Sequence, residues 1–272
     1  MNIVAGAKNL KEAAWLFSNG ADEVYCGLTD VPNHRRESLS IRNKSEFFKI
    51  MDLAKVKRKK LLLLINESCA PDKYPKLAEK VKKLVERGVG GLVIKDISVI
   101  EYLQQYGVKS CYILSSLALA FNSKALEFFR KYDIKRIILP NHLAPAAAGK
   151  IIRNKYRIET EMFYYPSHFC QNVDPLCKFC DWSPEHKPCK LRLNSECGGF
   201  VMPAPGADSL ADIMYDGHRA GVKYLKIPRT LDFCGLKRFV LDARRLTGLL
   251  EGRISRKEFR KAYRKVYSSS KL

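Results

Sequence analysis

Residues 19–27 read Asn-Gly-Ala-Asp-Glu-Val-Tyr-Cys-Gly, a helix stop followed at once by an apolar run of strand length. Glycine ends a helix readily because it adopts a positive φ at little cost. The same joint recurs at Arg87-Gly88, Tyr106-Gly107 and Ala220-Gly221, each time before another apolar run. This weak repeat indicates a chain in which helices and buried strands alternate.

The apolar runs predict eight strands, centred near residues 3, 24, 62, 93, 113, 138, 160 and 226. Helical spacing separates most of them, at 45–57, 74–86, 97–105, 123–132, 144–153 and 208–219. Eight such alternations over about 230 residues are typical of a TIM-type (β/α)8 barrel, an α/β fold. A doubly wound open sheet is the alternative, but no G-x-G-x-x-G motif follows an early strand.

We expect a single barrel domain over residues 1–272 that carries two additions. A cysteine-rich insert at about 166–200 follows the strand near 160, and a basic helical extension occupies about 236–272. Helical patterns at 239–250 and 257–266 fall in the extension, and the second turns Phe259, Tyr263 and Val266 to one side for packing. The carboxyl ends of barrel strands carry active sites, so the insert should lie over the mouth.

Five of the nine cysteines fall in this insert, namely Cys170, Cys177, Cys180, Cys189 and Cys197. Thiolates this close in sequence can hold a soft metal ion or an iron-sulfur cluster. The single C-x2-C pair makes structural zinc the weaker interpretation. Free cysteines can also pack as small apolar side chains, but polar residues such as Asn172, Asp174 and Lys178 surround this run. The run therefore favours a metal centre.

Glu161 is a candidate catalytic residue, because alternation places it on one strand face with Glu159 and Phe163. If that face is the lumen, Glu161 lies near the mouth as a general base or substrate-orienting group. The alternative is a barrel-core carboxylate paired with Lys or Arg. Arg229, at the end of the last strand, can grip a carboxylate or phosphate with two parallel hydrogen bonds.

Other polar residues follow the strands. Arg35, Arg36 and Arg42, in the loop after the second strand, can bind anions like Arg229 or remain solvated loop charge. The remaining strand ends offer Asn66, Asp96, Ser115, Ser116, Asn141 and His142.

The formal net charge is +21, with basic runs at 55–60 and from 253 onward. Such charge attracts RNA and other polyanions, or serves solubility alone. No apolar run approaches the roughly 20 residues that span a bilayer, and the start shows no secretory signal, so we expect a cytoplasmic protein. The protease motifs H-E-x-x-H and G-x-S-x-G are absent from the sequence.

Several phrases in order resemble the collagenase-like peptidase family U32. They are Gly-Ala-Asp-Glu-Val-Tyr-Cys-Gly (20–27), Leu-Ser-Ile-Arg-Asn (39–43), Ile-Leu-Pro-Asn (138–141), Glu-Met-Phe (161–163) before C-x6-C, Pro-Cys-Lys-Leu (188–191) and Gly-Val-Lys-Tyr-Leu-Lys-Ile-Pro-Arg (221–229). The family includes proteins of oxygen-independent ubiquinone synthesis, of the UbiU and UbiV type, and relatives that hydroxylate tRNA or ribosomal RNA. The resemblance implies a barrel, a 4Fe-4S cluster held by four cysteines, and oxygen-independent hydroxylation, with prephenate linked to it as oxygen source. It also implies a partner, either a paralogous family member in a heterodimer or RNA.

The resemblance assigns Cys170 and Cys177 to the family's first cysteine pair and Cys189 to the cysteine before its basic residue. The family often has another cysteine where this chain has Glu185, so we expect Cys180 as the fourth ligand, with Cys197 or Cys234 in reserve. The family's Ile-Glu-Gly-Arg reads Ile-Pro-Arg here, so a glutamate beside Arg229 is missing.

Three hypotheses follow. The first is an iron-sulfur hydroxylase of a small aromatic or quinone precursor or of RNA, with Glu161 and Arg229 at the substrate. The second is a protease of unassigned mechanism. The third is a non-catalytic RNA-binding or partner module with a structural metal.

Overall fold

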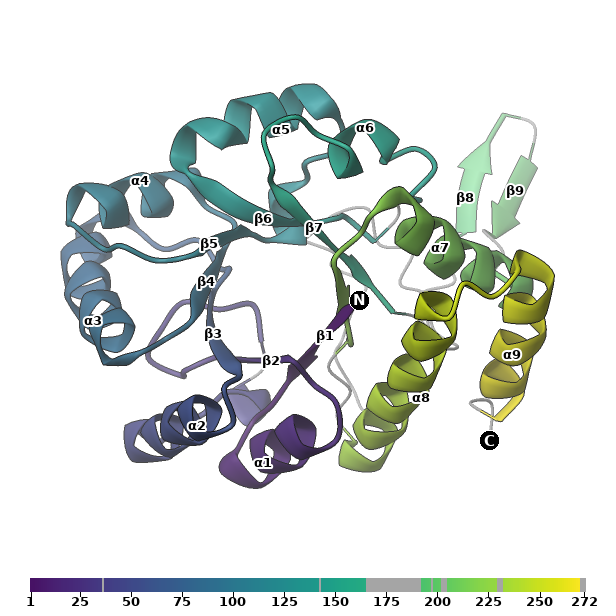
Figure 1. Ribbon diagram of the computed structural model, residues 1–272. Coiled ribbons are helices and arrows are strands. Elements are labelled where there is room, and N and C mark those ends of the chain that lie inside the picture. Colours follow the sequence, from purple (N-terminus) through teal and green to yellow (C-terminus); the bar gives the residue numbers. More distant parts are fainter. Residues whose placement is uncertain are drawn as a thin grey trace.

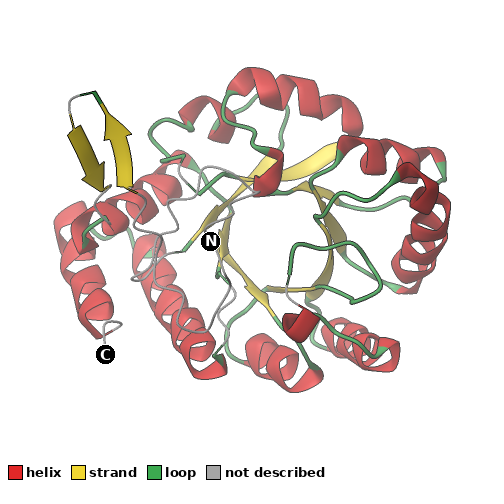
Figure 2. Cartoon of the chain, turned by 180° about the vertical axis from the view of Figure 1, so that it is seen from behind, coloured by secondary structure: helices red, strands yellow, loops and turns green. Residues whose placement is uncertain are grey.

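The computed structural model is a closed barrel of eight parallel strands with helices around it (Figure 1; Figure 2). It describes residues 1–35, 37–141, 143–164, 192–196, 198–201, 205–228 and 232–269. The strands follow one another around the barrel in the order β1-β10-β7-β6-β5-β4-β3-β2. The predicted (β/α)8 fold is confirmed.

Each of the eight predicted strand centres lies within a barrel strand. The strands are β1 (Asn2–Gly6), β2 (Glu23–Cys26), β3 (Lys60–Ile65), β4 (Gly91–Ile94), β5 (Tyr112–Leu114), β6 (Ile134–Ile138), β7 (Glu159–Phe163) and β10 (Tyr224–Lys226). Parallel strands buried on both faces need continuous apolar runs, and Leu61 to Ile65 in β3 is one, at most 3% exposed throughout.

The helices surround the barrel with their apolar sides turned inward, except that α9 packs on other helices. They are α1 (Leu10–Ser18), α2 (Lys44–Val56), α3 (Tyr74–Arg87), α4 (Ile97–Gln105), α5 (Ser123–Phe129), α6 (Gly149–Ile152), α7 (Ala207–Ala220), α8 (Phe233–Glu251) and α9 (Arg256–Ser269). In α3, for example, Leu77, Val81 and Leu84 recur at helical spacing and are buried. Short 3-10 turns occupy Glu37–Leu39, Pro71–Lys73, Ser116–Ala118 and Arg130–Tyr132.

Two helices differ from their predicted bounds by the most residues. The helix expected at 144–153 is only Gly149–Ile152, because residues 145–148 form turns that precede it. The helix expected at 239–250 begins earlier, at Phe233, where the Asp232 carboxylate accepts hydrogen bonds from the backbone N–H groups of Cys234 and Gly235. Such a cap satisfies amide groups that the first turn leaves unpaired.

The structure adds a hairpin that the sequence did not predict. β8 (Arg192–Ser195) pairs antiparallel with β9 (Gly198–Val201), and Figure 1 shows the pair outside the barrel beyond α7. These residues belonged to the predicted metal insert, and their short strands carry no long apolar run. Gly198, with φ of 113°, begins the second strand in a conformation that glycine tolerates best.

The last helix, α9, packs on α7. Phe259, Tyr263 and Val266 are buried at its contact face, which confirms the packing side predicted for it. No helix within the described ranges combines the length and the apolar character that crossing a lipid bilayer requires.

Candidate functional site

The barrel interior contains a buried network of charged side chains. The Arg136 guanidinium, from β6, donates to both carboxylate oxygens of Glu23 at 2.6 and 2.9 Å and to Glu161 at 3.0 Å. The Lys226 ammonium donates to the other oxygen of Glu161 at 3.2 Å. Two carboxylates and two cations are thus paired in a site that excludes water, with side-chain exposures of 8% or less.

Aromatic rings complete the network. The Arg136 guanidinium lies 3.3 Å from the centre of the Tyr224 ring. Burial favours the neutral form of Arg136, but the hydrogen bonds and charges of Glu23 and Glu161 win and raise its pKa. Arg136 therefore remains a permanent cation. Burial also raises the pKa of Tyr224 to about 12, so its hydroxyl stays protonated and donates to Glu159 at 2.9 Å.

Lys226 is the member of this network that lies nearest the mouth, at the carboxyl end of β10. It pairs in register with Phe163, the last residue of β7, whereas Glu161 pairs with Tyr224 one layer deeper. The Lys226 ammonium is 4.1 Å from the centre of the Tyr25 ring and 6.0 Å from that of Phe163. Lys226 and its two rings therefore form the floor of the mouth, and Glu161 supports Lys226 from below.

Tyr25 crosses from β2 over β1 to reach β10. Its hydroxyl donates to the Ile227 carbonyl at 3.2 Å, and a Cβ atom placed on Gly6 would lie 2.7 Å from its ring. Only a glycine in β1 leaves room for this ring, because a contact under 3 Å forces the neighbour to move. Gly6 thus sets the position of the tyrosine beneath the mouth.

Arg35 approaches the other side of the mouth from the loop after β2. Its guanidinium lies 5.4 Å from the Tyr25 ring centre and donates through Nη1 to the Ala7 carbonyl at 3.2 Å. Its Nη2 atom is buried and has no hydrogen-bond partner among the described residues. A buried donor without a partner is costly, so this nitrogen is suited to an anionic ligand such as a carboxylate or phosphate.

The predicted site residues are placed as follows. Glu161 faces the lumen, but it lies one layer below the mouth and is ion-paired, as the alternative interpretation expected. Its catalytic role stays a prediction. Arg229 and the four cysteines Cys170, Cys177, Cys180 and Cys189 lie outside the described residues, as do Arg36, His142 and Cys197.

Of the loop arginines, Arg35 reaches the mouth, whereas Arg42 is exposed and pairs with Glu37 at 3.1 Å. Several polar residues at strand ends hold the backbone. Asp96 and Ser115 accept hydrogen bonds from N–H groups of the turns that follow them, and Asn66 accepts one from the His34 N–H. The Asn141 side-chain oxygen, after the end of β6, is buried and lacks a hydrogen-bond partner within the described ranges.

Sequence reasoning missed Glu23, Tyr25, Arg136 and Lys226 as members of one site. Strand alternation puts Arg136 on the same face as Ile138, and Lys226 on the same face as Tyr224. Only the register between strands brings these residues together. An inward arginine beside strands with inward glutamates is the signal that could have found the network.

The described cysteines lie apart from one another. Cys26 is buried, Cys69 and Cys111 are half-buried, and Cys234 is exposed at the start of α8. Burial raises the pKa of the Cys111 thiol, which favours its neutral form. In the part of the chain that the structure describes, no three His, Cys, Asp or Glu residues form a group that could hold a metal.

A family model described as peptidase family U32 matches residues 8–177, well over half of the chain. The chain belongs to peptidase family U32. The matched stretch includes Glu161, Cys170 and Cys177 and ends before Cys180 and Cys189.

Among curated proteins, this U32 chain is 25% identical over 199 residues to tRNA hydroxylation protein P of Escherichia coli (strain K12). It is 26% identical over 200 residues to the protein of the same name from Haemophilus influenzae. Each match covers 72% of this chain and 42% of the relative, so the chain matches less than half of the length of these relatives.

Among solved structures, a U32 peptidase has a TM-score of 0.56 at 14% identity, covering 84% of this chain and 93% of its own. An oxaloacetate acetylhydrolase has a TM-score of 0.53 at 10% identity, covering 97% of this chain and 89% of its own. At such identities these likenesses concern the fold alone.

Proposed function

We propose that this U32 protein takes part in oxygen-independent hydroxylation of RNA, with an anionic substrate group bound at the barrel mouth. The reaction class is taken from the tRNA hydroxylation proteins to which the chain is similar. The structural observation that carries the proposal is Arg35, whose buried Nη2 atom finds no hydrogen-bond partner in the part of the chain that the structure describes. Phosphate and carboxylate groups are the ligands that a guanidinium binds best.

The charges of the mouth support an anionic ligand. Arg35 and Lys226 both stack near Tyr25, which positions their charges without cancelling them. The lumen network holds two carboxylates, Glu23 and Glu161, for its two cations, Arg136 and Lys226, so it leaves the charge of Arg35 unbalanced. An anion beside Arg35 would balance that charge. Glu161 is then a positioning residue that holds Lys226, and Arg229 is proposed to contact the substrate.

The proposed cofactor is a 4Fe-4S cluster with Cys170, Cys177, Cys180 and Cys189 as ligands. Four thiolates are the usual donor set of such a cluster, and bound there it would supply one-electron transfer. The cysteine segment follows Phe163 and Tyr164, at the carboxyl end of β7, which is the end of the barrel where Lys226 and Arg35 lie. The protein's own residues would bind and orient the substrate anion beside it.

Replacement of Arg35 by Gln tests the anion site. We expect hydroxylation at low substrate concentration to fall about tenfold to a hundredfold, because a charge-assisted hydrogen bond contributes about 1.5–3 kcal/mol. The fall should appear in KM and much less in the thermal stability. The measurement is the hydroxylated nucleoside content of RNA, by mass spectrometry, after anaerobic incubation with the purified protein or after expression in a strain that lacks it.

Arg42→Gln is the matched control, because Arg42 lies in the same loop and is 72% exposed beside Glu37. It should behave like the wild type. Equal activity of the Arg35 and Arg42 variants would contradict the anion site. Absence of any hydroxylated nucleoside with cluster-loaded wild-type protein, or hydroxylation of a quinone precursor instead, would contradict the RNA assignment.

A further inference from the structure

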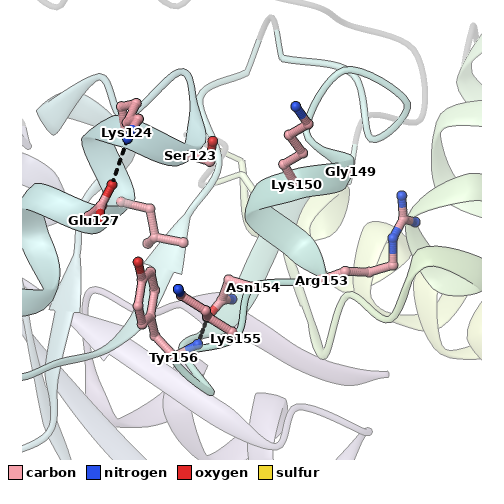
Figure 3. Close-up of a pocket in the computed structure, with 10 residues that line it drawn as sticks. Ser123, Lys124, Glu127, Gly149, Lys150, Arg153, Asn154, Lys155 and Tyr156 are labelled. Atoms are coloured by element: carbon pink, nitrogen blue, oxygen red, sulfur yellow. Dashed lines mark hydrogen bonds and ion pairs between the residues drawn. The ribbon is translucent and has the colours of Figure 1, made fainter.

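A cationic groove lies on the outer wall of the barrel, away from the mouth. It has a volume of about 530 Å³ and runs between α5, α6 and the loop before β7 (Figure 3). Its lining includes four cations, Lys124, Lys150, Arg153 and Lys155, and one carboxylate, Glu127. α5 follows the carboxyl end of β5, so its first residues, Ser123 and Lys124, lie on the mouth side of the groove.

The groove keeps most of its positive charge. Lys124 pairs with Glu127 at 3.2 Å, which uses the single carboxylate of the lining. Lys150, Arg153 and Lys155 are exposed, and none of them forms an ion pair with another described residue. Figure 3 shows Lys150, on α6, and Arg153, just after it, projecting in different directions, so they present separate contact points.

Neutral groups order the loop before β7 at one end of the groove. The Tyr156 ring has the Arg130 guanidinium 4.9 Å and the Lys155 ammonium 5.6 Å from its centre. Asn154 fixes the loop, because its side chain accepts from the N–H groups of Tyr156 and Ile158 and donates to two backbone carbonyls. Because a ring positions a cation without neutralising it, this loop is preorganised and Lys155 keeps its charge.

The α7–α9 contact shows the opposite arrangement. Arg256, Arg260 and Arg264 recur every four residues along α9 and each donates two hydrogen bonds to an aspartate of α7. Those arginines are neutralised and join two helices. Part of the positive charge of this chain is therefore used in ion pairs and cannot attract a ligand. The α5–α6 groove keeps cations that can.

We infer that the α5–α6 groove binds the phosphodiester backbone of RNA. The inference rests on the proposed function, since it assigns a docking surface to the RNA substrate. Separate lysine and arginine contacts beside an aromatic ring are typical of sites that follow a nucleic-acid backbone. A protein partner would need an apolar contact core. The large apolar side chains of this lining are Leu126, which is only 1% exposed, and the half-buried Tyr156. RNA that passes the start of α5 leads toward the mouth.

The test is the binding of a short, labelled single-stranded RNA of mixed sequence, followed by fluorescence anisotropy across about 50–200 mM salt. The variant is Lys150→Glu with Arg153→Glu and Lys155→Glu. Loss of three phosphate contacts should make the slope of log Kd against log salt shallower by about 2 and weaken binding at least about tenfold. The matched control reverses three exposed lysines at the opposite side of the barrel, Lys49, Lys55 and Lys57 on or just after α2, and should bind like the wild type.

Equal RNA affinity of the groove variant and the wild type would overturn the inference, as would equal losses in the groove and control variants. Polyaspartate is tested in the same way. If it binds as tightly as the RNA and loses affinity in the groove variant to the same extent, the RNA assignment is overturned in favour of an acidic protein partner. Circular dichroism verifies the fold of each variant, and single reversal of Lys150 gives a smaller loss if the triple variant does not fold. Binding needs no turnover, so RNA hydroxylation without groove binding refutes only this inference. Groove binding without hydroxylation refutes only the proposed function.

Discussion

Cys177→Ala is expected to remove the near-visible absorbance of the protein and its hydroxylase activity together. Each thiolate of a four-cysteine set holds one iron, so loss of one ligand destabilises the whole cluster. Cys170→Ala and Cys189→Ala should have the same effect. The measurements are the absorption spectrum of protein purified without oxygen and the hydroxylated nucleoside content of RNA incubated with it.

Cys69→Ala is the control, because Cys69 is half-buried, has no part in the proposed ligand set and should leave both readouts unchanged. Cys180→Ala is informative in either direction. Loss of absorbance assigns it as the fourth ligand, whereas full retention moves that role to Cys197 or Cys234. Full absorbance in the Cys177 variant would contradict the ligand assignment altogether.

Arg136→Met is expected to destabilise the fold more than any surface substitution. Removal of the guanidinium leaves Glu23 and Glu161 buried with too few partners, and breaking a buried ion pair typically costs about 3–5 kcal/mol. The measurement is the free energy of unfolding from urea titration. The expected result is a lower midpoint with a similar slope, since the surface exposed on unfolding changes little.

Arg264→Met provides the comparison, because Arg264 makes the same two-point contact with Asp208 on an exposed surface. Its midpoint should stay close to that of the wild type, since solvent screens exposed pairs. If both variants unfold at the same urea concentration, the lumen network does not stabilise the fold more than an exposed ion pair does.

The barrel could be predicted because its signals are local. A helix that ends at glycine and is followed by an apolar run indicates a strand, and four of the eight strands follow such a joint. The other four were predicted from their apolar runs alone. The short helix α6 was overestimated, because Ala146, Ala147 and Ala148 favour a helix in sequence, whereas the structure places them in turns.

The site was less predictable, because its residues meet only through strand register. Lys135 and Arg136 are neighbours of the same charge, yet Lys135 is exposed and Arg136 is 2% exposed inside the barrel. Tyr25 reaches the mouth floor only because Gly6 lies beneath it on another strand. The cysteine spacing predicts the ligands of a cluster but not their positions in space, so that prediction calls for a chemical test.

The most direct test is to measure the iron and acid-labile sulfide content of protein that has been purified without oxygen and without chelator. The account predicts about four irons and four sulfides per chain, together with the broad near-visible absorbance of a 4Fe-4S cluster. Zinc in place of iron, or no metal at all, would contradict the redox function proposed for the cysteine segment.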